Sequence, residues 1–400
     1  MCAAPVTRSI CGMTRTSNIA APEDPAGFLS SVPEILEEVR NGRMVVLVDA
    51  EDRENEGDLV IPAQMATPDA INFMAKHGRG LICLTLTQAR AQELRLEFMV
   101  RSKAARNRTA FTQSIEARDG ISTGISAHDR ALTIATAIDP TKGSHDVVSP
   151  GHVFPLVARE GGVLIRAGHT EASVDLARLA GLYPAAVICE VMNDDGTMAR
   201  MGDLVPFAAR HRLKVGTIED LIAYRARHER LVKHVAKTQI KSAFGADFEL
   251  NVYMTTVEPV EHLALVKGDL EKPGPVLVRV HAVNVLGDLL GVGEDLGEDR
   301  GSGTLVAKAM RAIEKEGRGV IVLIRDLGPK SVSDWIERRA APAPADRDAR
   351  GRRQVEIGVG SQILRDLGVS DMVLLTNSPA HVYVGLEAFG LRIVGTRAIE

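Results

Sequence analysis

Apolar residues in the first half of the chain follow two periods, one typical of helices and one of strands. A capping-box sequence over 31–34 opens a run with helical spacing, which ends at Gly42. Further strands are predicted over 44–48, 59–61, 81–87, 109–117, 163–165 and 185–196, and further helices over 67–78, 88–96, 129–138 and from 168 onward. This mixture predicts an α+β domain with a mixed sheet and helices packed around it.

A second pattern begins at Asp247, where strands and helices alternate. The predicted strands cover 248–257, 262–268, 276–285, 319–325 and 372–376, and the predicted helices cover 304–316 and 362–367. Such an alternating series is typical of an α/β domain. The insert 339–353 is rich in Pro, Ala and charge and has no apolar anchor, so we expect it to be mobile.

The chain has 400 residues, which is too long for one ordinary core and predicts two domains. A helix predicted over 217–235 turns basic and is expected to end the first domain as a solvated connecting helix. We therefore divide the chain into a disordered tail (1–27), a first domain (28–230), a linker (231–246) and a second domain (247–400).

Composition narrows the class of protein. Apolar residues make up 45% of the chain and charged residues 25%, as in ordinary globular proteins, and the net charge of −4 gives no reason to expect nucleic acid or a membrane surface as a partner. Cys83 and Cys189 stand in apolar runs and predict buried free thiols, typical of the cytoplasm. The first 25 residues lack the apolar core of a secretory signal. Two interpretations of this segment are a transit peptide and a disordered tail, and we favour the disordered tail.

The segment Asp49–Asp58 carries the most distinctive chemistry. It places six carboxylates within ten residues, directly after an apolar strand. Mutual repulsion among these charges is most simply offset by a hard divalent cation, together with an Arg that binds a phosphate or carboxylate. An acidic surface loop is the alternative. Gly57 allows a sharp turn, so we expect an elbow that presents Arg53, Glu54, Glu56 and Asp58 to a site.

Three later segments add candidate site residues. The loop Gly120–Arg130 is rich in Gly and hydroxyls, which suits close approach to a polar ligand, although a plain connection would also explain it. A helix predicted to begin near Gly168 would offer free amides to a phosphate, next to Arg166, His169 and Thr170. Glu190 lies in an apolar strand, where an unpaired carboxylate is costly.

Four motifs together identify a family. EDRENEGDL, STGISAHDR, RAGHTEASVDL and the Glu of VICEVM occur in the order found in 3,4-dihydroxy-2-butanone 4-phosphate synthases, which the region from about 28 to 230 resembles. The resemblance implies Mg²⁺-dependent conversion of ribulose 5-phosphate to formate and a four-carbon phosphate in riboflavin biosynthesis. It also implies a homodimer. The segment 107–112 departs from the family pattern, where a His or Gly often precedes the Thr.

The same resemblance assigns roles to residues. It implies that Glu54 and His169 bind the metal, with Mn²⁺ as an alternative to Mg²⁺ because His is a soft ligand for Mg²⁺. His152 and Glu190 are implied as the catalytic acid/base pair. The implied substrate-binding residues are Arg53, Glu54, Asp58, Arg166, Ala167, Gly168, His169, Thr170 and Glu190.

The region from Asp247 resembles GTP cyclohydrolase II at RVH, LGDLLG, SQILRDLGV and LLTNSP. That resemblance implies an α/β fold with a mixed, largely antiparallel sheet. The family binds zinc through three Cys, but the aligned residues are Asn284, Asp295 and Gly297, and the chain has no Cys after Cys189. Without thiolates that zinc site cannot form, so we expect no zinc and no GTP hydrolysis.

Other losses point the same way. Arg353 and Val355 stand where the family has its catalytic Asp and Arg, His381 replaces a nucleotide-contacting Lys, and only Thr376 remains of that pair. We expect this domain to be structural or regulatory. Two alternatives remain: a truly bifunctional enzyme that also hydrolyses GTP, and a non-catalytic nucleotide-binding or scaffold protein.

Overall fold

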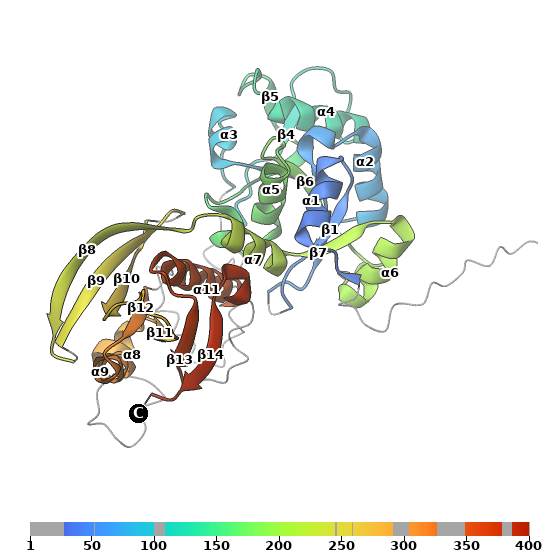
Figure 1. The fold of residues 1–400 in the computed structure, drawn as a ribbon. Coiled ribbons are helices and arrows are strands. Elements are labelled where there is room, and N and C mark those ends of the chain that lie inside the picture. Colours follow the sequence, from blue (N-terminus) through green and yellow to red (C-terminus); the bar gives the residue numbers. More distant parts are fainter. Residues whose placement is uncertain are drawn as a thin grey trace, which may run out of the picture.

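The computed structural model describes residues 28–51, 53–99, 109–244, 246–257, 259–290, 304–325, 349–377 and 386–399. The expectations for the tail, for 339–348 and for His381 fall outside these ranges. Within them, every helix is too short or too polar to cross a lipid bilayer. The described elements form two layered domains side by side (Figure 1).

The first domain is built on a mixed seven-stranded sheet, ordered β4-β5-β3-β6-β2-β1-β7. The β1–β7 and β3–β5 pairs are parallel and the others antiparallel. This sheet confirms the α+β prediction. The strands are β1 (Val45–Val48), β2 (Gly57–Pro62), β3 (Cys83–Leu86), β4 (Ile115–Ala117), β5 (Val147–Val157), β6 (Ala186–Glu190) and β7 (Lys214–Thr217).

Helices cover both faces of this sheet, and each face has its own core. Ile35, Leu176 and Leu221, from α1, α5 and α7, pack on one face, whereas Ile71, Ile134 and Leu204, from α2, α4 and α6, pack on the other. Burying each such side chain contributes roughly 1.5–3 kcal/mol. The helices are α1 (Val32–Arg40), α2 (Pro68–Phe73) with a π-helical turn η3 (Met74–Gly78), α3 (Gln88–Glu93), α4 (Ala127–Ile138), α5 (His169–Leu179), α6 (Met201–His211) and α7 (Ile218–His228).

Strand register places three predicted site residues on one face of this sheet. Asp58 pairs with Glu190 across β2 and β6. Cys83 of β3 pairs with both Ile188 and Phe154. Because side chains two residues apart share a face, Glu190 and His152 lie on the same side, in one row at the same end of the sheet. That is the face covered by α5, which begins at His169.

The second domain has another mixed seven-stranded sheet, ordered β14-β13-β11-β12-β10-β9-β8. Its parallel and antiparallel neighbours are equally frequent, so the sheet is less antiparallel than the family resemblance implied. Its elements are β8 (Val232–Ser242), β9 (Ala246–Thr255), β10 (Glu261–Lys267), β11 (Val276–Ala282), α8 (Val285–Leu290), α9 (Leu305–Glu316), β12 (Gly319–Ile324), α11 (Ala349–Asp366), β13 (Asp371–Leu375), η6 (Leu386–Phe389) and β14 (Arg392–Arg397). The first domain also contains two short 3₁₀ helices, η2 (Ala63–Met65) and η4 (Gly162–Leu164).

Several local predictions were wrong. The expected linker 231–246 contains β8, an edge strand of the second sheet, and the helix predicted to 235 ends at His228. The strand predicted over 163–165 is the 3₁₀ turn η4, and the one over 109–117 shrinks to β4. The helix predicted over 362–367 begins at Ala349, inside the segment expected to be mobile.

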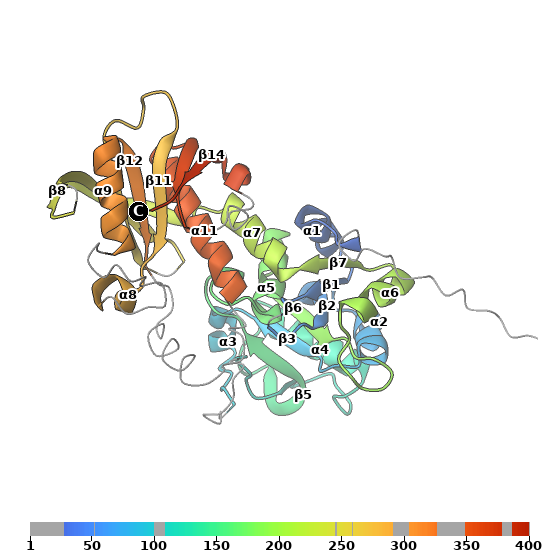
Figure 2. The same cartoon turned by 90° about the horizontal axis from the view of Figure 1, so that it is seen from below.

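Helices α7 and α11 connect the two domains. They lie against each other in both views (Figures 1 and 2). Gln362 of α11 donates to the carbonyl oxygens of Ala226 and Glu229, each at 2.8 Å, and accepts from the Leu231 amide at 2.8 Å. These bonds satisfy groups left open at the end of α7. The second domain therefore caps the last helix of the first.

Candidate active site

The acidic elbow connects β1 to β2 and is organised by Asp49. The Asp49 carboxylate accepts hydrogen bonds from the Glu54 amide at 3.1 Å, the Glu56 amide at 2.8 Å and the Arg53 guanidinium at 2.7 Å. Asn55, with φ 54°, occupies the left-handed region, so the sharp turn expected at Gly57 falls there. Gly57 instead allows close packing, because a Cβ at that position would overlap Leu204.

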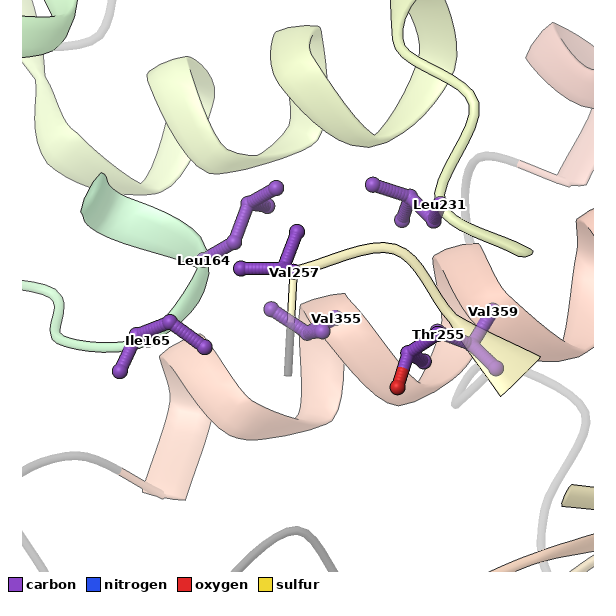
Figure 3. Close-up of a pocket in the computed structure, with 7 residues that line it drawn as sticks. All are labelled: Leu164, Ile165, Leu231, Thr255, Val257, Val355 and Val359. Atoms are coloured by element: carbon purple, nitrogen blue, oxygen red, sulfur yellow. The ribbon is translucent and has the colours of Figure 1, made fainter. Parts of the chain in front are cut away.

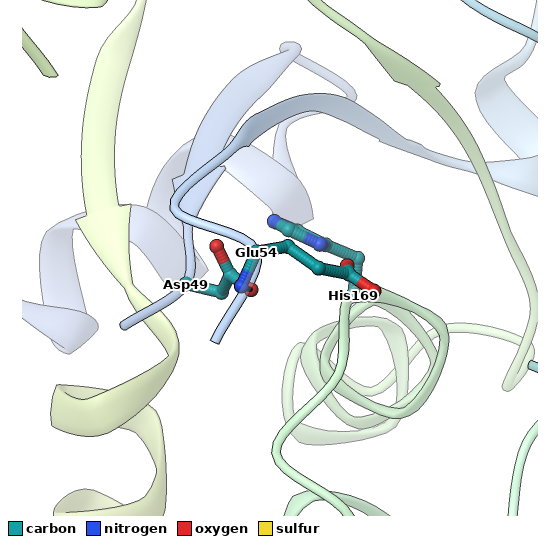
Figure 4. A group of neighbouring side chains, drawn as sticks. All are labelled: Asp49, Glu54 and His169. Carbon is teal, nitrogen blue, oxygen red and sulfur yellow. Dashed lines mark hydrogen bonds between the residues drawn. The ribbon is translucent and has the colours of Figure 1, made fainter. Parts of the chain in front are cut away.

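Asp49, Glu54 and His169 form a candidate metal centre. One ligand atom from each lies within 4.8 Å of the others (Figure 4). Asp49 and His169 are buried and Glu54 is half-buried. Two carboxylates suit a hard divalent cation, and an imidazole adds affinity for Mn²⁺ or a similar ion. The donor set therefore fits the predicted Mg²⁺ or Mn²⁺, with Asp49 as a neighbour that the sequence had not singled out.

His169 is the first residue of α5 and points toward β1. Its Nε2 lies 3.2 Å from the carbonyl oxygen of Leu47 and 3.8 Å from Oδ1 of Asp58. Burial lowers the pKa of His169, although the nearby Asp49 carboxylate acts in the opposite direction. The neutral imidazole is thus favoured, and only the neutral form can ligate a metal.

Asp58 and Glu190 form the acidic pair beside this cluster. Asp58 is 3% exposed and its Oδ1 accepts no hydrogen bond from the described residues. Burial, followed by the charge of Glu190, raises the pKa of Asp58 well above its usual range. Glu190 accepts a hydrogen bond from the Leu81 amide at 2.8 Å. A buried carboxyl oxygen without a partner is costly, and a bound polyol or cation would relieve that cost.

Arg166 and the start of α5 form the cationic side of the site. Arg166 is buried and donates to Glu171 at 2.6 Å and to Thr109 at 3.1 Å. Gly168 is the N-cap of α5, so the first amides of that helix are available to an anion near Thr170. Ala167 packs at the edge of the core under this segment. The predicted helix start is confirmed.

His152 lies apart from the metal cluster. It projects from β5, is 44% exposed, and hydrogen-bonds through Nδ1 to Glu116 of β4. Because β3 separates β5 from β6, two strand spacings, about 10 Å, lie between His152 and Glu190. The structure thus brings Arg53, Glu54, Asp58, His169 and Glu190 together, and places His152 at the far end of the same row.

Two neighbours of these residues were missed in the sequence. Asp49 forms an ion pair with Arg53 inside the loop between β1 and β2, where spacing along the sequence does not indicate which side chains meet. Glu116 is the partner of His152 across β4 and β5, and no local pattern links residues 36 positions apart. Cys83 and Cys189, as predicted, are buried thiols whose pKa values are raised by burial.

The second domain also carries a polar cluster at the end of β11. His281 Nε2 is 2.8 Å from Oδ2 of Asp288, which also accepts the Asn284 amide at 2.8 Å. Arg279 donates to the carbonyl oxygen of Leu375 at 3.1 Å. Asn284 is one position where the resemblance expects a zinc-binding Cys, and here it begins a short helix instead. Within this cluster, the Asp288 carboxylate is bonded by two neighbouring donors.

Comparison with known proteins agrees with both resemblances. Residues 33–224 match the family model of 3,4-dihydroxy-2-butanone 4-phosphate synthase, and residues 233–398 match that of GTP cyclohydrolase II. The chain therefore belongs to the two-domain riboflavin-biosynthesis family in which a 3,4-dihydroxy-2-butanone 4-phosphate synthase domain precedes a GTP cyclohydrolase II domain.

Individual relatives cover nearly the whole chain. A riboflavin biosynthesis protein RibBA of Aquifex aeolicus is 48% identical over 380 residues, 91% of each chain. A 3,4-dihydroxy-2-butanone 4-phosphate synthase of Photobacterium phosphoreum is 45% identical over 366 residues, 92% of this chain and 98% of that protein. The crystal structure of RibBX from A. baumannii, described as a two-domain synthase of the same name, superposes with a TM-score of 0.75 at 42% identity, covering 92% of this chain and 100% of that one.

Proposed function

We propose that the first domain converts D-ribulose 5-phosphate to L-3,4-dihydroxy-2-butanone 4-phosphate and formate, with Mg²⁺ or Mn²⁺. One observation carries the proposal: Asp49, Glu54 and His169 converge beside the buried carboxyl of Asp58, whose Oδ1 accepts no hydrogen bond from the described residues. Family membership supports the same reaction. A cation held by Glu54 and His169 would supply Lewis-acid stabilisation to vicinal sugar oxygens.

The chain's own residues divide the remaining work. Arg166 and the first amides of α5 bind the phosphate, since a guanidinium and a helix start are both suited to that anion. Asp58 binds a substrate hydroxyl in the buried part of the site. Glu190 moves a proton at the sugar, and His152, which is held by Glu116, is its acid/base counterpart.

The second domain, in this proposal, neither binds zinc nor hydrolyses GTP. The chain has four Cys, all at or before position 189, so three zinc-binding thiolates cannot be assembled in the second half. We further propose that the chain forms a cytoplasmic homodimer and that its small-molecule substrate is ribulose 5-phosphate. Nucleic acid and membranes are not partners in this proposal. The proposed domain limits follow the two matched regions, with β8 assigned to the second domain.

Formate release decides the proposal. Purified full-length protein with ribulose 5-phosphate and Mg²⁺ should release one formate per substrate, and EDTA should stop the release. Excess Mg²⁺ should restore it. Unchanged ribulose 5-phosphate in the presence of ample Mg²⁺ and Mn²⁺ would contradict the proposed reaction.

The bifunctional alternative has its own test. Incubation of the same protein with GTP should release no formate, and elemental analysis should find no stoichiometric zinc. GTP turnover accompanied by one zinc per chain would establish the alternative instead, and would show that ligands other than Cys hold the metal.

A further inference from the structure

The segment that leads into the phosphate side of the site is a tight turn. Gly161 and Gly162 have φ values of 89° and 63°, in the left-handed region that favours glycine. The amides of Ile165 and Arg166 both donate to the carbonyl oxygen of Gly162, at 3.0 and 3.1 Å. The backbone position of Arg166 therefore depends on the geometry of η4.

From the first domain, η4 is held by a buried ion pair. Arg225 of α7 donates to the Gly161 carbonyl oxygen and to Asp175 of α5, each at 2.7 Å. Asp175 also accepts the Val163 amide at 2.8 Å. Arg225 is 2% exposed, and its other donors bind Glu229 at 2.7 and 2.6 Å. This network fixes one side of the turn and ends at the junction with the second domain.

From the second domain, apolar side chains close the other side. Val257, which follows β9, packs so closely on Gly161 that a Cβ there would overlap its Cγ1. Val355 and Val359 of α11 face Leu164 and Ile165 across a small apolar pocket (Figure 3). The turn that precedes the candidate phosphate site is thus enclosed by residues from both domains.

The seating of α11 depends on Gly358. A Cβ at Gly358 would lie 2.9 Å from the Cβ of Ala226 in α7, closer than real Cβ atoms approach one another. Because the opposing atom is itself a Cβ, neither side chain can rotate away. The glycine, together with the Gln362 hydrogen bonds to the end of α7, sets how deeply α11 sits against the first domain.

We propose that the second domain positions the phosphate-binding segment Arg166–Thr170 through η4, with Val257, Val355 and Gly358 as positioning residues. The proposal rests on the proposed function of that segment and gives the domain a role that needs no zinc. The residues proposed to bind and transform the substrate all belong to the first domain. The second domain restricts the backbone of η4, so it affects the affinity for the phosphorylated substrate more than the proton transfers.

A matched pair of glycine substitutions in one helix tests the proposal. Gly358→Ala pushes α11 away from Ala226, whereas Gly360→Ala meets the Val280 side chain at 3.2 Å, inside the second domain. Both changes raise helix propensity equally. We expect Gly358→Ala to raise KM for ribulose 5-phosphate roughly three- to tenfold, because small displacements of binding groups weaken substrate binding, with kcat within about twofold. Gly360→Ala should resemble the wild type.

Hydrogen–deuterium exchange of peptides covering 161–170 provides a readout that needs no turnover. Exchange should be faster in full-length Gly358→Ala than in the wild type, and unchanged in Gly360→Ala. Val257→Ser, which removes a methyl contact with Gly161 and adds no volume, should act in the same direction and serves if Gly358→Ala fails to fold. Wild-type exchange and KM in both Gly358→Ala and Val257→Ser would overturn the proposal. If the wild type releases no formate, the proposed function fails. The exchange rates of residues 161–170 still show whether the second domain restrains η4.

Discussion

Both domains end a sheet in a polar cluster, and the two clusters differ in how the aspartate carboxyl group of each is bonded. In the second domain, Asp288 accepts from both His281 and the Asn284 amide. In the first, Asp58 is buried with an oxygen that accepts no bond from the described residues. An unsatisfied buried carboxyl lowers stability and is retained where a ligand completes it. The difference is therefore that the first cluster leaves a buried carboxyl oxygen open to a ligand, whereas the Asp288 carboxylate is already bonded within the second domain.

The largest expected effect comes from the candidate metal ligands. Glu54→Ala and His169→Ala should each lower formate release from ribulose 5-phosphate by more than about a hundredfold, since even residues outside the metal's direct ligands change affinity by about 10- to 100-fold. Steady-state formate assays at saturating Mg²⁺ measure the loss. Glu51→Ala, an exposed acid in the same elbow, is the control and should be nearly neutral. Near-normal rates in both ligand variants would contradict the assignment.

Asp58→Asn should separate activity from stability. It removes the group proposed to bind a substrate hydroxyl, so turnover should fall by about tenfold or more, yet the melting temperature should rise by a few degrees. The exposed Asp119→Asn serves as the control. A lower melting temperature for Asp58→Asn at neutral pH would show that the carboxylate stabilises the first domain.

The stability gain from Asp58→Asn should depend on pH. The folded-state pKa of Asp58 is raised, so the folded protein binds this proton more tightly than the unfolded chain. Wild-type stability is therefore lost as the pH rises from about 3.9, the ordinary Asp value, through the raised pKa. The advantage of the variant should grow over that window and disappear below it, as denaturant titrations at several pH values would reveal.

A smaller effect is expected from a substitution in the second domain, which should lower stability and leave activity unchanged. Asp288→Ala removes the acceptor of His281 and of the Asn284 amide, and should destabilise that domain by about 1–2 kcal/mol. Formate release at a temperature where the variant remains folded should be unchanged. Urea unfolding and the formate assay together check both halves of this expectation. A large loss of turnover in folded Asp288→Ala would mean that this cluster contributes to the first site.

The smallest expected effect concerns the two buried thiols of the first domain, Cys83 and Cys189. Burial raises the pKa values of Cys83 and Cys189, so both should react slowly with a thiol reagent at pH 8. In a Cys2→Ser/Cys11→Ser variant, labelling should require denaturant and formate release should stay normal. Rapid native labelling that blocks turnover would place a reactive thiol in the site.

Much of the first site could be predicted because its signals are local. The acidic elbow, the helix start at Gly168 and Glu190 in an apolar strand all depend on neighbouring residues, and the structure brings them together. The strand predicted over 163–165 failed because Asp175, on α5, captures the Val163 amide and favours a 3₁₀ turn. Such a long-range bond leaves no trace in the local apolar pattern.

The second domain was harder to predict at its edges. The basic run after α7 suggested a continuing helix, but 232–242 pair with β9 as an edge strand, where exposed Lys side chains are common. The start of α11 was missed because Arg and Gly interrupt its apolar period, and its packing partner is α7 of the other domain. Tertiary contacts override local propensity in both places, through strand pairing within the second domain for β8 and through packing on α7 of the first domain for α11.

The short junction between α7 and β8 has a mechanical consequence. Only residues 229–231 separate the two elements, and Gln362 bonds to both sides of that junction. A connection of three residues, hydrogen-bonded on both sides, prevents the two domains from rotating against each other. The two domains of one chain should therefore tumble together as one rigid body, so a fluorophore on either domain should report the same rotational correlation time.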